Sequence, residues 1–167
     1  MRKEDSMEDK QISDQIAAAV ASRLREICRV DLAVAKRLTA TIEQYCREQG
    51  LNAVIAVCNP KGNPIAVHVM DGAFLLSYDV AVKKAYTAAA VKMSTMELNA
   101  LAQPGGTFYG IDRADGGRIV ILGGGVPLKA GDRIVGALGI SGGTAEQDDA
   151  AARYGAAALA QIWQESL

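Results

Sequence analysis

His68 is the only histidine among the 167 residues, so any chemistry that needs an imidazole must use it. It lies in an apolar stretch with the alternation of a strand, which would place Ala66, His68 and Met70 on one face. Histidine and methionine both serve as axial ligands of haem iron. The two side chains would lie too close together to hold one iron from both sides, so at most one would bind it. The alternative is a partly exposed strand histidine beside a methionine of the core.

Two glycine-rich segments are the second candidate for binding. They consist of Gly123, Gly124 and Gly125, and of Ser141, Gly142, Gly143 and Thr144. The second segment joins a predicted strand to the start of a predicted helix, where free backbone N–H groups and the helix dipole attract anions. A phosphate, a carboxylate or a tetrapyrrole propionate would suit such a site, whereas neither segment is a Walker loop or a dinucleotide fingerprint. The alternative is that these glycines only permit tight turns and close packing.

Charged residues form a third group of candidates. Glu146, Asp148 and Asp149 lie in the first turn of the last predicted helix, where they could hold a hard metal ion or only stabilise the helix by about 0.3–1 kcal/mol each. Lys83 and Lys84 lie on an alanine-rich predicted helix, and the alternatives for them are a solvated face, an ion pair or an activated amine. With one histidine and no G-x-S-x-G segment, we do not expect a hydrolase triad.

Composition restricts the class of protein. Lys and Arg number 18 against 19 for Asp and Glu, a net charge of −1 that lacks the basic excess of nucleic-acid binders. No uncharged apolar stretch approaches the roughly 18 residues of a membrane span, and the polar N-terminal segment does not have the pattern of a signal peptide. The three cysteines contain no C-x-x-C pair, which argues against a disulfide framework and a thiolate zinc site. We therefore expect a soluble, cytoplasmic protein with no nucleic-acid or membrane partner.

The first fifty residues predict two helices. Apolar residues recur at three- and four-residue steps from Ile12 to Ile27, which is typical of an amphipathic helix of about 18 residues, with Ser13 or Asp14 as the cap. A second helix is expected from Asp31, a suitable N-cap, to about residue 50. We accordingly divide the chain into a polar start with an amphipathic helix, residues 1–30, and a domain of residues 31–167.

The remaining sequence predicts two pairs of strands and three helices. Strands are expected at residues 53–58, 64–70, 118–122 and 133–141, and helices at residues 77–92, 94–102 and 144–164. Turn residues at 59–63 make the first two strands a hairpin. Capping-box spacings begin the last two helices, at Ser94 with Glu97 and at Thr144 with Gln147. The order ααββααββα predicts an α+β fold, an antiparallel sheet of two hairpins flanked by helices in a profilin-like arrangement of layers.

Several segments together resemble one family. They are HVMDGAFLLS, KKAYTAAAVKMST, LAQPGGTFYGI and GGRIVILGGGVPLKAGDRIVGALGISGGTAEQD. In this order they resemble the GlcG/HbpS/PduO C-terminal-domain family over about residues 32–162. The most specific part is G-G-G-V-P-L with S-G-G-T-x-E-Q-D at this separation.

The resemblance implies a compact antiparallel sheet flanked by helices, often assembled into homo-oligomers. Family members include haem-binding proteins and a domain fused to the corrinoid adenosyltransferases of propanediol and glycerol utilisation, whose adenosyltransferase activity belongs to the other domain. We therefore expect a non-catalytic, oligomeric binding module for a tetrapyrrole, haem or a corrinoid, accessory to cobalamin-dependent glycerol or diol metabolism. Its partners would be copies of itself and the diol or glycerol dehydratase or adenosyltransferase machinery. The ligand would contact His68, Met70 and the two glycine-rich segments, with His68 on a haem iron.

Two other functions are compatible with the sequence. One is an enzyme acting on a small carboxylate or cofactor, with Glu146 or Lys84 as the acid–base group at the floor of a pocket. The other is a structural or scaffolding subunit that uses its first helix and its alanine-rich faces as interfaces.

Overall fold

The computed structural model describes residues 2–165, apart from the side chains of residues 2–9 and 25–27. The elements in chain order are α1 (Arg2–Ile27), α2 (Leu32–Glu48), β1 (Val54–Cys58), β2 (Pro64–Val69), α3 (Ser77–Val91), α4 (Thr95–Leu101), two short 3₁₀ turns (Ile111–Arg113 and Asp115–Gly117), β3 (Gly125–Ala130), β4 (Arg133–Ser141) and α5 (Ala145–Gln164). The predicted order of helices and strands and the α+β class are confirmed.

The four strands form one antiparallel sheet in the order β2-β1-β4-β3. The central strand β1 is buried along its whole length, which accounts for its uninterrupted apolar sequence. Ile55 on β1 lies opposite His68 on β2 and opposite Ile140 on β4. Residues opposite each other in an antiparallel pair share a face, so His68 and Ile140 both lie on the face of Ile55.

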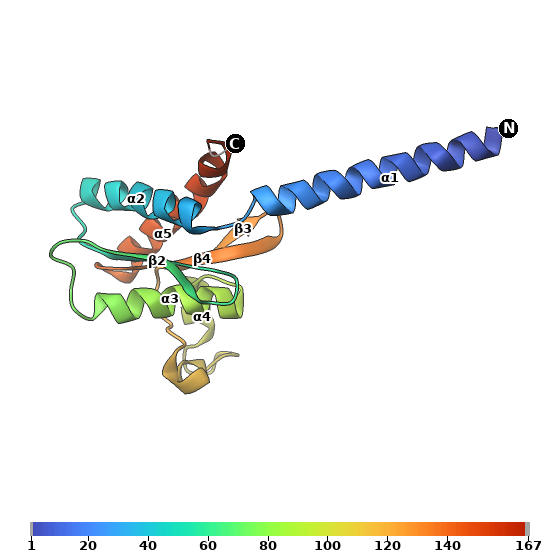
Figure 1. Cartoon of the computed structure of the whole chain (residues 1–167). Helices are drawn as coiled ribbons and strands as arrows, with labels where there is room; N and C mark the ends of the chain where they lie inside the picture. Colours follow the sequence, from blue (N-terminus) through green and yellow to red (C-terminus); the bar gives the residue numbers. More distant parts are fainter. Residues whose placement is uncertain (1, 166–167) are drawn as a thin grey trace.

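Helices cover both faces of the sheet (Figure 1). Helices α2 and α5 pack on one face around Leu38, Ile42, Ile55 and Leu138. Helix α3 packs on the other face through small residues of an alanine-rich cluster. The approach is close, because a Cβ atom at Gly139 would lie 1.9 Å from the carbonyl oxygen of Ala81. Small residues on both sides therefore let α3 lie directly against β4.

The predicted helix starts are confirmed in the body of the protein. The Asp31 side chain accepts a hydrogen bond from the Val34 amide and caps α2. Complete capping boxes begin α4, at Ser94 and Glu97, and α5, at Thr144 and Gln147. These local hydrogen bonds satisfy amide groups that have no partner inside the helix.

The predicted strand at residues 118–122 is wrong. That segment is a loop beside α3 and α4, where the Val120 amide donates to Thr87 Oγ1 and the Ile121 carbonyl accepts from the Asn99 side chain. The third strand is β3, which begins at Gly125 in the segment expected to be only a glycine-rich connection. The apolar β-branched residues of this segment are typical of a strand, and they led to the wrong prediction. The segment can remain a loop because side chains of α3 and α4 supply hydrogen bonds that a sheet would otherwise provide.

Helix α1 is longer than predicted and begins at Arg2, so Ser13 and Asp14 lie inside it. It extends away from the rest of the molecule (Figure 1). Its stripe residues Ile12, Ile16, Val20 and Leu24 are 52–59% exposed, whereas the Ile27 side chain is outside the described part of the chain. No helix among the described residues is long and apolar enough to cross a membrane.

Candidate functional site

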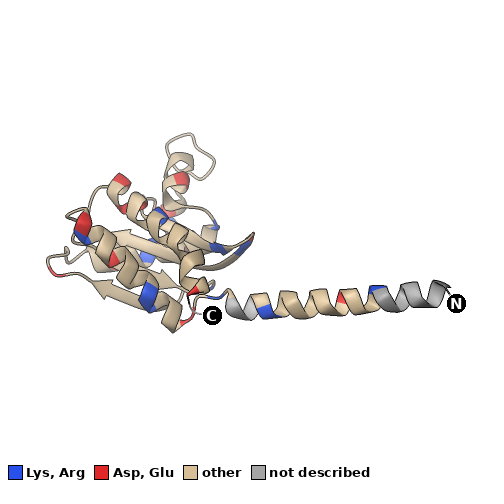
Figure 2. Ribbon diagram, turned by 90° about the horizontal axis from the view of Figure 1, so that it is seen from above, with Lys and Arg blue, Asp and Glu red and all other residues tan. Residues whose placement is uncertain are grey.

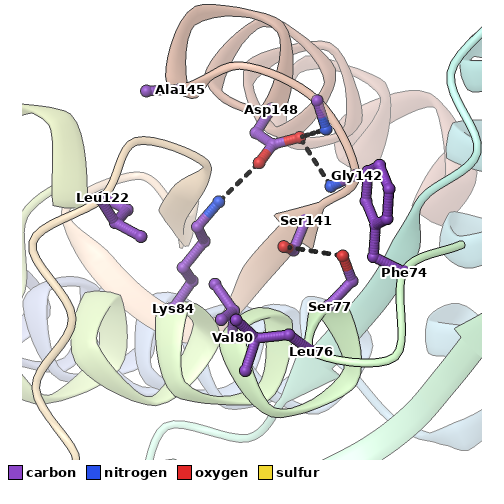
Figure 3. A pocket seen from close by; sticks show the side chains of 11 residues that line it. Phe74, Leu76, Ser77, Val80, Lys84, Leu122, Ser141, Gly142, Ala145 and Asp148 are labelled. Atoms are coloured by element: carbon purple, nitrogen blue, oxygen red, sulfur yellow. Dashed lines mark hydrogen bonds and ion pairs between the residues drawn. The ribbon is translucent and has the colours of Figure 1, made fainter.

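A buried ion pair between Lys84 on α3 and Asp148 on α5 lies at the centre of the site (Figure 3). Lys84 Nζ donates a 2.7 Å hydrogen bond to Asp148 Oδ2 and another of 2.7 Å to the carbonyl oxygen of Ile140. The Lys84 side chain is only 2% exposed and that of Asp148 4%. The lysine therefore connects α3 to the end of β4 and to the start of α5.

Asp148 also occupies the backbone amides at the start of α5. Its Oδ1 accepts hydrogen bonds from the Gly142 amide, at 3.0 Å, and from the Gly143 amide, at 2.9 Å. These are N–H groups that the sequence marks as attractive for an anion. In the structure the anion they bind is a carboxylate of the same chain.

The electrostatics of the pair follow from its burial. Burial lowers the pKa of the Lys84 ammonium below its ordinary value, and the hydrogen bond and charge of Asp148 oppose that shift. A charge removed from water is tolerated only where hydrogen bonds replace hydration. Here the ammonium has two oxygen acceptors and the carboxylate has three N–H donors, so each charge is compensated within the chain.

A pocket of about 470 Å³ opens beside this ion pair. Its apolar wall consists of Phe74 and Leu76 from the β2–α3 loop, Val80 from α3 and Leu122 from the loop before β3 (Figure 3). Phe74, Leu76 and Leu122 are 71%, 69% and 51% exposed.

The polar side of the pocket is formed by Lys84, Asp148 and Ser141. The Ser141 hydroxyl donates a hydrogen bond of 3.2 Å to the Ser77 hydroxyl. The volume lies within the range of about 300–1,000 Å³ that is typical of small-molecule sites.

The structure places the two glycine-rich segments on either side of Lys84. Ser141, Gly142 and Gly143 line the pocket, whereas Thr144 caps α5. Gly123, Gly124 and Gly125 are tightly packed: a Cβ atom at Gly124 would lie 2.6 Å from the Ile140 carbonyl oxygen and 3.0 Å from Lys84 Nζ. Close packing is thus what these three glycines permit, and they do not line the pocket.

His68 and Met70 lie away from the pocket. His68 is on the sheet face covered by α2, and Met70 is part of the core on that same face. The predicted common face of His68 and Met70 therefore agrees with the structure, but neither residue is brought together with Ser141, Gly142 and Gly143 at the pocket. Their role as ligands stays a prediction.

The imidazole of His68 is held between two side chains of α2. His68 Nε2 lies 3.1 Å from the Thr39 hydroxyl oxygen, and that hydroxyl donates to the Lys36 carbonyl. His68 Nδ1 lies 3.3 Å from Glu43 Oε2. Both ring nitrogens therefore have partners, and iron ligation would require one of them to leave its partner.

Sequence reasoning did not find the Lys84–Asp148 pair or the apolar wall. An ion pair was one alternative for Lys84, but its partner could not be predicted from the sequence because Asp148 is 64 residues away along the chain. One signal was present: Lys84 falls on the same helical stripe as the buried Ala81, Ala85 and Ala88. A lysine on a buried stripe requires a buried acceptor.

Glu146, Asp149 and the buried cysteines do not line the pocket. Glu146 is exposed, and Asp149 forms an ion pair with Arg153. Among the described residues, no group of three or more His, Cys, Asp or Glu side chains could hold a metal ion. Burial raises the pKa of the Cys46 thiol to about 11 and that of Cys58 to about 12, so both remain protonated near neutral pH.

The model of the family described as haem-degrading protein HbpS-like matches residues 30–157. The chain belongs to the HbpS-like family. The match leaves out all of α1 and the end of α5.

Two relatives of this HbpS-like chain come from Citrobacter freundii. An uncharacterized 15.0 kDa protein of the dhaT–dhaS intergenic region is 37% identical over 127 residues, which cover 76% of this chain and 89% of that protein. The corrinoid adenosyltransferase PduO is 38% identical over 112 residues, 67% of this chain. The match covers 33% of PduO, so the chain spans about a third of that enzyme's length.

Solved structures with the same fold confirm the α+β architecture of the HbpS-like chain. The Klebsiella pneumoniae protein ORFY has a TM-score of 0.76 and 34% identity, covering 78% of this chain and 90% of that one. A PduOC:heme complex has a TM-score of 0.74 and 33% identity, covering 78% and 94%.

Proposed function

We propose that this HbpS-like chain binds haem and that the macrocycle lies against the apolar wall formed by Phe74, Leu76, Val80 and Leu122. The observation that carries the proposal is this exposed apolar wall, in a chain 33% identical to the protein of a PduOC:heme complex. Large apolar side chains gathered at the mouth of a pocket favour a ligand with a large apolar surface, because covering them removes that surface from water. Leu75, which is 97% exposed beside this wall, adds to the apolar surface.

An alternative proposed site for the haem uses His68 as a ligand of the iron. The support is its position on the edge strand β2, where its side chain is about one-third exposed, and the carboxylate of Glu43 beside Nδ1. Metal-bound histidines commonly have a carboxylate on their other nitrogen. Because His68 lies on the opposite sheet face from the wall, it cannot ligate a haem that lies against the wall of the same chain, so the two sites are alternatives that mutation separates.

We further propose an accessory role beside corrinoid chemistry. The support is the similarity to the corrinoid adenosyltransferase PduO of Citrobacter freundii, at 38% identity. Haem and corrinoids are both large flat macrocycles, so the apolar wall would suit either. In the same proposal, the partners of the chain are further copies of itself and the dehydratase or adenosyltransferase machinery. Its location would be the cytoplasm.

A titration of the full chain tests haem binding. Haemin is added to the wild type and to Leu76→Asp, and the Soret band is followed to saturation. We expect saturable binding by the wild type and binding at least tenfold weaker by Leu76→Asp, because a carboxylate in the wall must be desolvated. A parallel titration with cobalamin distinguishes the two macrocycles.

Leu32→Asp is the matched control, since Leu32 is also an exposed leucine, at 52% against 69% for Leu76, but lies at the start of α2, outside the pocket. Equal binding by the wild type and both leucine variants would contradict the proposed binding site at the wall. His68→Ala is titrated in the same series. A changed Soret position with retained affinity would support iron ligation by His68, and an identical spectrum would remove His68 as the ligand.

A second candidate function is favoured by one observation, the buried ammonium of Lys84 at the pocket. An enzyme acting on a small carboxylate would use such a group, whereas Glu146 is exposed and does not line the pocket. For this candidate we expect small carboxylates to raise the Tm of the wild type but not that of Leu76→Asp. The absence of any rise across a panel of carboxylates would contradict it.

A further inference from the structure

Helix α1 has an apolar stripe that the rest of the chain leaves uncovered. At 1.5 Å per residue its 26 residues extend about 39 Å. Ile12, Ile16, Val20 and Leu24 follow one another at four-residue steps, and each is more than half exposed. An isolated helix of this kind has little stability in water, because most helical stability in proteins comes from the packing of an apolar face.

The charges of α1 identify what could cover the stripe. Residues 2–15 contain three basic and five acidic residues, a net charge of −2, and residues 16–29 contain three basic and one acidic residue, a net charge of +2. Two such helices side by side repel if parallel and attract if antiparallel. The middle of the helix, between Asp14 and Arg23, carries no charge (Figure 2).

We propose that two copies of the chain pair through α1, antiparallel, about a two-fold axis level with Ala18. In this register residue i lies level with residue 36 − i of the second copy. Ile12 then lies level with Leu24 of the second copy, and Ile16 with Val20. The stripe is therefore complementary to itself, as a two-fold interface requires.

The register also directs the start of the second copy's helix to an apolar groove. The groove, of about 530 Å³, lies at the base of α1 between Leu24, Cys28, Ala130 and Trp163. Residues 5–8 of the second copy come level with residues 28–31, where this groove lies. The interface would thus continue from the stripe onto the body of the protein.

A lipid surface fits α1 less well than a second copy. Helices that bind membrane surfaces are rich in Lys and Arg on their polar face. The charges of residues 2–29 sum to zero. The opposite signs of the two halves instead match a partner with the same two halves in reverse order.

The particle mass of the full chain tests the pairing. Wild type, the double variant Ile16→Asp/Val20→Asp and the control Ala18→Asp are compared by light scattering after gel filtration, with circular dichroism to confirm equal helix content. Ala18 lies on the side of α1 opposite the stripe, at 100° per residue, so its variant adds a like charge outside the interface. We expect half the wild-type mass for the double variant and the wild-type mass for Ala18→Asp. Equal masses for all three proteins would overturn the proposal.

Cross-linking tests the direction and register of the pair. In a Cys28→Ser background, Ile12→Cys/Leu24→Cys should form a disulfide-linked dimer on mild oxidation, whereas Ile12→Cys alone should remain a single chain. Dimers of Ile12→Cys alone would show parallel helices and would overturn the antiparallel arrangement. Absence of dimers from the double cysteine variant would overturn the register.

Discussion

The Lys84–Asp148 pair satisfies more groups than a pair of opposite charges normally does. The ammonium donates to Asp148 and to the Ile140 carbonyl, and the carboxylate accepts the amides of Gly142 and Gly143 as well. Removing one member of a buried pair leaves the charge of the other uncompensated. This lowers the free energy of unfolding by more than the intact pair adds to it. The two members are not equivalent, because Asp148 also satisfies two backbone amides.

We predict that Asp148→Ala lowers the free energy of unfolding by about 3–5 kcal/mol, because it leaves a buried ammonium and two amides without their acceptor. Lys84→Met should cost less, about 1–3 kcal/mol, since Asp148 keeps its two amide donors. Urea unfolding followed by circular dichroism measures both values.

Lys83→Met is the matched control for these variants. Lys83 is the neighbouring lysine of α3 and forms an ion pair with Asp79 near the surface, at 2.9 Å. Exposed pairs contribute about 0–1 kcal/mol. An Asp148→Ala variant that is no less stable than Lys83→Met would show that the buried pair is not a structural link.

At the scale of elements, the capping box of α4 gives the protein a pH dependence. Hydrogen bonds from the Ser94 backbone and side chain lower the pKa of Glu97 below its ordinary value of 4.5. Its stabilising contribution is therefore complete above about pH 4.5 and is lost as the pH falls through the lower pKa of the folded state.

We predict that wild type is more stable than Glu97→Gln at neutral pH and that this difference disappears in acid below the folded-state pKa of Glu97. Unfolding free energies over a pH series measure it. The capping box of α5 has Gln147 in the equivalent position and no titrating carboxylate there, so the cost of Gln147→Ala should stay constant over the same series. A pH-independent difference for Glu97→Gln would contradict the assignment.

Local signals predicted most elements, and long-range contacts decided those that were missed. The cap at Asp31 and both capping boxes involve residues three apart, so the sequence displays them directly. Whether residues 118–122 form a strand depends instead on hydrogen bonds to α3 and α4.

The candidate site shows the same division. The amides before α5 were predicted to attract an anion, but their partner is a carboxylate of that same helix. The partner of Lys84, 64 residues away, and the apolar wall, built from three separate segments, follow from the tertiary fold.

At the scale of the whole molecule, the pocket, His68 and helix α1 are three candidate binding surfaces that lie apart from one another. The pocket lies at the end of β4, between helix α3 and the start of α5. His68 lies under α2, on the sheet face opposite α3. Helix α1 extends from the body and carries the proposed pairing surface (Figure 1). The proposed haem binding and the proposed pairing through α1 therefore involve different residues and can be tested independently.

A crystal structure of the full chain with haemin tests the central claim most directly. We predict density for the macrocycle against Phe74, Leu76 and Leu122, with the Lys84–Asp148 pair intact beside it. Macrocycle density elsewhere, with this wall still open to solvent, would contradict the account.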